Sequence, residues 1–237
     1  MATVESLQTH LLEELADLLD AEQQLTRALP KLAQAATFKP LKQALQKHLK
    51  ETRVHVTRLK DAMRELGESP QPKTCKGMQG LLQEGETVMN KTPAGALRDA
   101  VMITGAQKVE HYEIASYGTA RTYAKVLGET SVARLLKQTL DEEKAADLTL
   151  TQIAERSVND DAAEEWQAQE DDTALARTAE WAGKAAAGAS RQFAHGIRRA
   201  AVTIGIAHER SGKRRGERTR SRKSASSTSA RRTSKKR

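Results

Sequence analysis

Two glutamates and a tyrosine interrupt an apolar helical face in the stretch VEHYEIASYGTA, residues 109–120. At about 100° per residue, Glu113 lies about 60° from Glu110 around a helix, and Tyr117 lies about 20° from Glu110. Apolar residues before and after this stretch continue the same face. Because carboxylates are seldom buried without a partner, the pattern predicts a ligand or a counter-charge for both glutamates.

Three other helical patterns carry similar interruptions near their middles. Together with Glu110 and Glu113, the inward-facing candidates are Glu22, Glu51, His55, Glu143 and Asp147. Candidates three or four residues apart share one face of their helix. The spacing also repeats between the two halves of the chain. In the first half, 29 residues separate Glu22 from Glu51, and in the second half 30 separate Glu113 from Glu143. All seven side chains are therefore predicted to point inward at a similar depth.

These residue types favour a pair of metal ions. No Lys or Arg lies on the inward faces as drawn from the sequence, so carboxylates buried there must take up protons or bind cations. Oxygen ligands with one imidazole suit iron or manganese better than a thiolate-preferring metal, and several carboxylates that can bridge suit two ions. We predict two transition-metal ions, with iron as the first choice and manganese as the alternative.

A structural role is the alternative for each residue taken alone. A single glutamate on an amphipathic face often lies at its solvent edge, and His55 is alternatively a structural histidine bonded to a carboxylate. Tyr117 is either a packed, hydrogen-bonded tyrosine or a residue that relays an electron or a proton. His48, one turn before His55, is assigned to the core or to contact with a ligand, rather than to the metal itself.

Apolar residues at three- and four-residue steps predict the elements that position these side chains. Four helices are expected, approximately over residues 4–38, 41–66, 94–128 and 130–157, with Pro and Gly at their boundaries. Short connections join the helices within each half, whereas roughly 27 residues, with a short helix near 78–89, connect the halves. This order predicts an all-α, ferritin-like four-helix bundle made of two antiparallel hairpins and one long crossover.

Charge divides the chain into parts that need separate explanations. The bundle is expected over residues 1–157. It is followed by an extension over 158–212 that is first acidic and then rich in Ala and Gly, and that could be helical. A disordered basic tail is expected over 213–237. The tail holds 12 Lys or Arg residues against one acid, a net charge of +11, so residues 1–212 carry −3. A mildly acidic body therefore precedes a strongly basic tail.

The remaining composition favours a cytoplasmic protein. The single cysteine, Cys75, excludes an intramolecular disulfide and suits a reducing compartment. The N-terminus lacks a basic region followed by an apolar core, which argues against a signal peptide, and no run of 18 apolar residues predicts a membrane span. The sequence shows no Gly-rich phosphate loop, Cys/His zinc spacing or Ser/His/Asp arrangement. A homo-oligomer, in particular a dimer, is expected.

Five segments carry a resemblance to a known family: ELADLLDAEQQLTRALPKLAQAA, HLKETRVHVTRL, KTCKGMQGL, AQKVEHYEIASYGTAR and LLKQTLDEEKAADLTLTQIAE. Over residues 4–157 they resemble the stress-induced YciE/YciF-type branch of the ferritin-like superfamily. The resemblance implies a di-iron-type bundle in which the seven candidates are ligands. Two positions depart from the commoner pattern. The second helix offers Glu-x-x-x-His where Glu-x-x-His is usual, and the fourth offers Asp147 where histidine is usual.

Three functions are compatible with these features. The first is an oxidoreductase whose two irons react with peroxide or oxygen during stress. In the second, the protein sequesters iron or manganese without turnover. The third is a DNA-associated protective role in which the bundle is a scaffold and the basic tail binds nucleic acid.

The tail itself has three interpretations: a solubilising extension, a nucleic-acid-binding arm, or a contact with an anionic membrane surface. It contains no Phe, Trp, Leu or Ile that would insert into lipid, which favours nucleic acid over a membrane. No aromatic is present to stack on bases, so binding should be independent of sequence.

The tail hypothesis predicts a specific dependence on salt. If about six phosphates are engaged, the affinity for duplex DNA should fall with salt concentration at a log–log slope near −5. Deleting residues 213–237 should abolish this binding and leave metal binding intact, which a mobility-shift titration at several salt concentrations would measure. A truncated chain that binds DNA as tightly as the full chain at the same salt would exclude the tail as a DNA-binding arm.

Overall fold

The computed structural model describes residues 6–184, and these residues form helices and loops without a strand. The elements are α1 (Leu7–Ala35), α2 (Lys39–Glu65), α3 (Lys76–Lys91), α4 (Ala96–Val126), α5 (Thr130–Ile153) and a π-helical turn η1 (Ala154–Val158). A further helical stretch runs from residue 159 to residue 184. The first compact unit ends at Asp172, and Thr173 begins a second unit. The predicted all-α class is confirmed.

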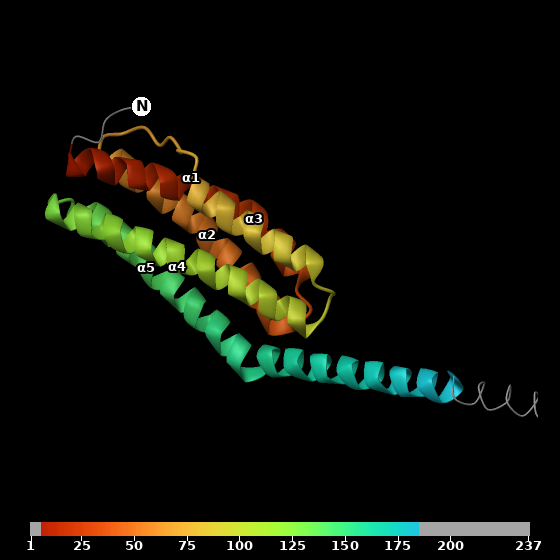
Figure 1. The fold of residues 1–237 in the computed structure, drawn as a ribbon. Coiled ribbons are helices and arrows are strands. Elements are labelled where there is room, and N and C mark those ends of the chain that lie inside the picture. Colours follow the sequence, from red (N-terminus) through yellow and green to blue (C-terminus); the bar gives the residue numbers. More distant parts are fainter. Residues whose placement is uncertain (1–5, 185–237) are drawn as a thin grey trace, which may run out of the picture. The chain divides into compact units, whose positions relative to one another are not determined.

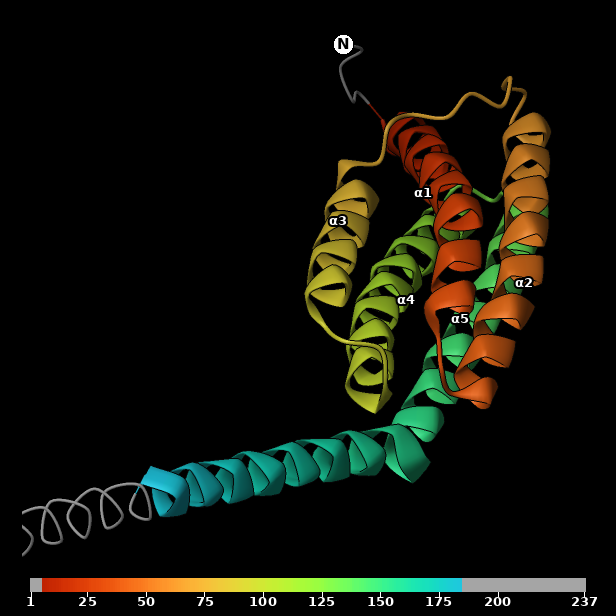
Figure 2. The same cartoon turned by 90° about the vertical axis from the view of Figure 1, so that its right-hand side faces the viewer.

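The four long helices form a bundle of two hairpins (Figure 1). Helix α1 packs along α2, α4 packs along α5, and the hairpins meet through α2 against α5 and α1 against α4. The predicted crossover contains α3, which packs against α4 and lies beside it in Figure 2. Gly128, with a φ of 81°, occupies the short turn between α4 and α5, where a residue with a side chain would be strained.

The core consists of two apolar clusters separated by a polar layer. One cluster includes Leu25, Leu29, Leu41, Leu45, Met102 and Leu150. The other includes Leu11, Leu15, Leu59, Tyr117, Val132 and Leu136. Buried polar residues lie between them in sequence on every long helix: Glu22, His48, Thr52, His55, Glu110, Glu113, Thr139 and Glu143. The apolar clusters therefore hold the helices together on both sides of a layer that contributes little hydrophobic stabilisation itself.

Helix α4, which carries two of the buried glutamates, begins with unusual capping. Its N-cap residue is Gly95, which has a φ of 144° and no side chain to accept from the first amides. The carboxylate of Glu165 accepts instead, 3.0 Å from the amide nitrogen of Ala96 and 3.4 Å from that of Leu97. A Cβ atom on Gly95 would lie 2.9 Å from the oxygens of Glu165. Glycine is required here both for its backbone conformation and for the space it leaves.

No helix among the described residues is long and apolar enough to cross a membrane. The basic tail over 213–237 and most of the Ala/Gly-rich segment lie outside the described residues.

Asp99 joins the start of α4 to the turn between α1 and α2. The side chain is fully buried. Its Oδ1 accepts from the amide of Thr37 at 3.0 Å, and its Oδ2 accepts from the amide of Phe38 at 2.6 Å and from Thr37 Oγ1 at 2.5 Å. Because carboxylate hydrogen bonds of this kind are stronger than neutral ones, this side chain fixes the register between the two hairpins.

Replacing Asp99 by alanine should lower the free energy of unfolding by about 3 kcal/mol, because the amides of Thr37 and Phe38 and the hydroxyl of Thr37 lose their charged acceptor. Chemical denaturation would measure the change. Asp141→Ala is the matched control, since Asp141 is exposed and pairs only with Lys137 on its own helix, and its loss should cost about 0.5 kcal/mol or less. Equal stabilities of the two variants would contradict the role given to Asp99.

Candidate metal centre

Six ionisable side chains from the four long helices meet in the polar layer. Helix α1 supplies Glu22, α2 supplies His48 and His55, α4 supplies Glu110 and Glu113, and α5 supplies Glu143. His48 is the most exposed of them, at 6%. Each residue follows or precedes apolar core residues on its own helix by one turn, so burial of the apolar stripe carries the polar side chain inward with it.

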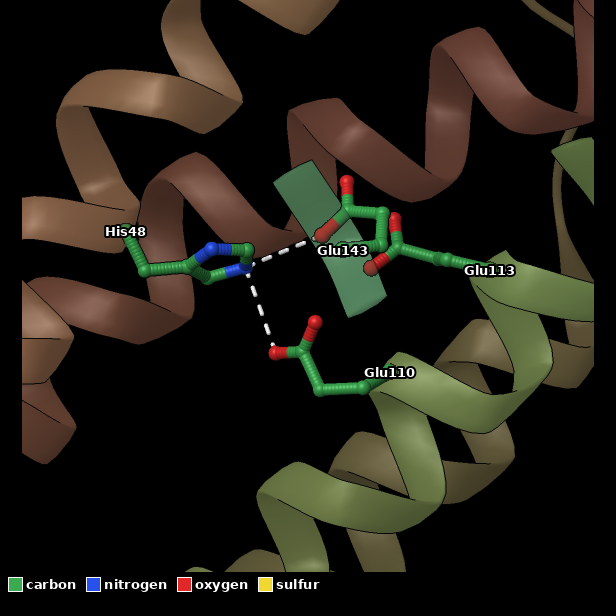
Figure 3. A group of neighbouring side chains, drawn as sticks. All are labelled: His48, Glu110, Glu113 and Glu143. Atoms are coloured by element: carbon green, nitrogen blue, oxygen red, sulfur yellow. Dashed lines mark ion pairs between the residues drawn. The ribbon is translucent and has the colours of Figure 1, made fainter. Parts of the chain in front are cut away.

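The first group consists of His48, Glu110, Glu113 and Glu143. Each offers one ligand atom, and these atoms all lie within 4.8 Å of one another. The Nε2 atom of His48 is 3.3 Å from Glu110 Oε1 and 3.7 Å from Glu143 Oε2. Figure 3 shows the imidazole approaching the carboxylates from the opposite side, with Glu110 and Glu113 projecting from the same helix.

The second group consists of Glu22, His55 and Glu143, again with ligand atoms within 4.8 Å of one another. The Nδ1 atom of His55 is 2.8 Å from Glu143 Oε1 and 3.2 Å from Glu22 Oε1. Glu143 belongs to both groups, because its two oxygens face different imidazoles. One carboxylate thus lies between two sets of potential ligands.

Many of these ligand atoms are buried without a hydrogen-bond partner. They are Glu22 Oε2, His48 Nε2, His55 Nδ1, Glu110 Oε2, both oxygens of Glu113 and both oxygens of Glu143. The contacts of His55 Nδ1 with Glu22 and Glu143 are close in distance but do not meet the geometry of hydrogen bonds. Unpartnered buried oxygens are costly, and this concentration of them fits cations. The donor set, mostly carboxylate oxygens with two imidazole nitrogens, consists of groups that coordinate metal ions.

Electrostatics separates Glu143 from the other carboxyl groups. Burial raises the pKa of Glu22 to about 7, although His55 opposes the change. Burial, together with the charge of Glu143, also raises the pKa values of Glu110 and Glu113 well above the ordinary range. Burial would raise the pKa of Glu143 too, but His55 and His48 outweigh it and lower that pKa. Without a cation, Glu143 is therefore the carboxyl group of this layer that gives up its proton most readily.

His55 is oriented by a pair of residues outside the two groups. Its Nε2 atom is 2.7 Å from Glu142 Oε2, and Arg58 binds both oxygens of Glu142 at 2.5 and 3.0 Å. Burial lowers the pKa of His55, but Glu143 and Glu22 outweigh it and raise that pKa to about 11. A carboxylate on one imidazole nitrogen turns the other nitrogen toward the site, as is common for metal-binding histidines.

The sequence reasoning missed three of these participants. It assigned His48 to the core or to contact with a ligand, whereas the structure places its side chain within the first group. It also did not single out Glu142 or Arg58. One available signal was their position: Glu142 directly precedes Glu143, and Arg58 follows His55 by three residues, so both lie beside the inward faces.

Tyr117 is fully buried, and its hydroxyl donates to Glu22 Oε1 at 2.6 Å. Burial and the charge of Glu22 raise its pKa well above the usual value. Its phenol ring also lies edge-on to the imidazole of His55, with 6.5 Å between ring centroids. The tyrosine is therefore a protonated donor in direct contact with one candidate ligand.

Glu51 and Asp147 lie at the edge of the layer and outside both groups. Glu51 Oε1 is 2.5 Å from Lys47 Nζ, and Oε2 is 3.9 Å from His48 Nδ1. Asp147 Oδ1 accepts from Gln107 Nε2 at 3.1 Å and lies 3.4 Å from His111 Nε2. Both side chains are 23% exposed. Their role as ligands stays a prediction, and Lys47 is a basic neighbour that the sequence pattern did not place near the site.

A family model described as a domain of unknown function, DUF892, matches residues 6–163. Protein YciF of Escherichia coli K12 is 46% identical over 160 residues, which is 67% of this chain and 95% of YciF. The crystal structure of the E. coli stress protein YciF matches with a TM-score of 0.63 and 43% identity, and covers 66% of this chain and 99% of that one.

YcfI from Rhodopseudomonas palustris matches with a TM-score of 0.61 and 38% identity, and covers 62% of this chain and 94% of that one. These matches confirm the family resemblance that the sequence motifs indicated. The family model stops at residue 163 and does not include the basic tail.

The buried carboxyl groups predict how the stability of chelator-treated protein changes with pH. Because the pKa of Glu22 is about 7 in the folded chain instead of 4.5, the folded chain keeps a proton that the unfolded chain releases between these pH values. The free energy of unfolding should therefore fall as pH rises through this window, by up to roughly 3 kcal/mol from this group. Glu110 and Glu113 act in the same direction.

Chemical denaturation at pH 5, 6, 7 and 8 would measure this fall. Glu22→Gln is the matched control, because the amide has similar size, accepts from Tyr117 and does not titrate. The variant should show a shallower dependence on pH in this range. An identical dependence in both proteins would rule out the proton on Glu22.

Proposed function

This chain belongs to the DUF892 family, and we propose that it is a stress-response protein that holds two iron or manganese ions and reacts with peroxide or oxygen. The observation that carries the proposal is Glu143, a fully buried side chain that faces His48 with one carboxylate oxygen and His55 with the other. A carboxylate between two sets of unpartnered ligand atoms is the arrangement that a bridged pair of ions needs.

The two groups assign ligands to two ions. His48, Glu110, Glu113 and Glu143 would hold one ion, and Glu22, His55 and Glu143 would hold the other. Glu51 and Asp147 are reserve ligands at the edge of the layer. Glu51 lies beside the first group, because its Oε2 atom is 3.9 Å from His48 Nδ1 while its Oε1 atom pairs with Lys47.

A small cavity beside the first group, lined by apolar and charged side chains, supports a small substrate. Its volume is about 30 Å³, and its lining includes Lys47, His48, Glu51 and Glu110. This space is about the size of two water molecules, so it has room for peroxide or oxygen. The cavity lies beside the first group and is bordered by two exposed or half-exposed charged residues, Lys47 and Glu51.

The protein's own residues would supply protons and orientation. Bound iron or manganese would supply the redox chemistry that breaks down peroxide or reduces oxygen. Glu142 and Arg58 hold the His55 ring in one orientation. Tyr117 stays protonated, and its hydroxyl donates a hydrogen bond to Glu22. It is therefore placed to supply a proton or an electron to the site. The apolar clusters on both sides exclude bulk water from the layer.

Metal analysis of the purified full chain tests the proposal. We expect two ions per chain after loading with Fe(II) or Mn(II) and removal of the excess. The variant Glu113→Gln with Glu143→Gln should lose both ions, because one ligand is shared. Asp141→Asn with Glu65→Gln removes the same charge from exposed positions and should keep two. Full occupancy in the Glu113/Glu143 variant would disprove the site.

Bound metal should also raise the melting temperature, because it binds the folded state alone. At a free metal concentration 100 times the dissociation constant the gain is about 2.7 kcal/mol. Equal melting curves with and without a chelator would contradict a filled site.

Reaction with peroxide separates an enzyme from a storage protein. After anaerobic loading with iron, repeated consumption of peroxide would support turnover, whereas a single stoichiometric oxidation would support sequestration alone. Tyr117→Phe keeps the ring and removes the hydroxyl, so it should bind metal normally and slow turnover. DNA association through residues 213–237 remains a separate prediction from the sequence, as do a dimer and a cytoplasmic location.

A further inference from the structure

A second cavity, of about 240 Å³, lies between α1, α3 and α4. Its walls are mainly apolar and include Leu25, Leu29, Leu82, Met89, Met102 and Val109. Its inner end reaches Glu110, and its outer residues are exposed. The cavity is distinct from the smaller cavity beside Lys47, because the two share only Glu110.

Glycines create this space. Helix α3 approaches α4 closely where Gly85 faces Gly105, since a Cβ atom on Gly105 would lie 3.7 Å from the Gly85 Cα atom. A Cβ atom on Gly85 would meet no other atom within 4 Å. Ala28, from α1, is a further small residue in the lining. The crossover helix is thus held against the bundle while the space under it stays open.

The outer rim carries more positive than negative charge. Arg27 and Lys31 are exposed, lie one turn apart on α1, and line the cavity. Neither forms an ion pair within the described part of the chain. On the α3 side the rim has one acid, Glu86. At the inner end, Glu110 is buried and one of its oxygens has no partner. An anionic group is therefore favoured at the rim and disfavoured inside.

We propose that this cavity binds a straight-chain carboxylate, with the alkyl chain inside and the carboxylate at Arg27 and Lys31. An apolar cavity of about 150 Å³ accommodates benzene, so a cavity of 240 Å³ has room for about ten carbon atoms. Two cationic side chains at the mouth complement one carboxylate. This binding does not depend on metal in the polar layer.

Calorimetric titration of the full chain with acetate, hexanoate, octanoate and decanoate tests the proposal. We expect saturable binding of one ligand per chain, no binding of acetate, and an affinity that rises by about fourfold for each added CH₂ group up to about ten carbons. Absence of saturable decanoate binding would overturn the proposal.

Two pairs of variants locate the ligand. Gly85→Leu fills the cavity and should weaken octanoate binding at least tenfold. Gly80→Leu makes the same substitution on the same helix, where a Cβ atom also meets nothing, but outside the cavity lining, and should have no effect. If Gly85→Leu does not fold, as judged by circular dichroism, Ala28→Leu fills the cavity from α1. Equal effects of the Gly85 and Gly80 substitutions would overturn the location.

Charge at the rim is tested in the same way. Arg27→Gln with Lys31→Gln should weaken octanoate binding about fivefold and leave 1-octanol binding unchanged. Lys50→Gln with Arg53→Gln removes the same charge from exposed positions on α2 and should change neither. Equal losses for octanoate and octanol in the Arg27/Lys31 variant would overturn the assignment of an anionic ligand.

Discussion

The structure depends on how the polar layer of the bundle compensates the burial of four glutamates, whose ionisable neighbours within the layer are two imidazoles. Taking an ionised carboxylate out of water costs several kcal/mol unless a proton or a cation compensates it. Glu22, Glu110 and Glu113 have raised pKa values, whereas that of Glu143 is lowered. The layer cannot hold itself together by hydrophobic contact, so the leucine-rich clusters on either side fix the helices in register. The centre of the bundle is therefore a layer whose carboxyl groups are stabilised by a bound cation or by protons.

Two partly exposed residues orient one of the buried histidines. Arg58 and Glu142 are partly exposed, yet through them His55 is held with Nδ1 toward two buried carboxylates. On the opposite side the phenol of Tyr117 fixes Glu22. These contacts restrict the side chains on one half of the layer, whereas Glu113 has neither oxygen satisfied. The half around His55 is thus preorganised, and the half around His48 has more freedom to adjust to an ion.

Helical periodicity was sufficient to predict the long helices, the crossover and the inward orientation of Glu22, Glu110, Glu113 and Glu143, because each lies on a strong apolar stripe. It was not sufficient for the edge of the layer. A position within about 60° of the stripe centre is buried or half-exposed according to the neighbouring helix, and so Glu51 and Asp147 lie apart from the groups while His48 lies inside one. The cavity under α3 follows from the approach of Gly85 to Gly105, which no local pattern encodes.

The capping of α4 by Glu165 has a consequence for what counts as the domain. Glu165 lies two residues beyond the end of the family match, yet its carboxylate satisfies the first amides of the helix that presents Glu110 and Glu113. Gly95 has no side chain that could cap the helix, and the space it leaves is occupied by the carboxylate of Glu165. A residue of the acidic extension is thereby part of the architecture of the bundle, and a minimal fragment cut at the edge of the family would leave the first amides of this helix without their acceptor.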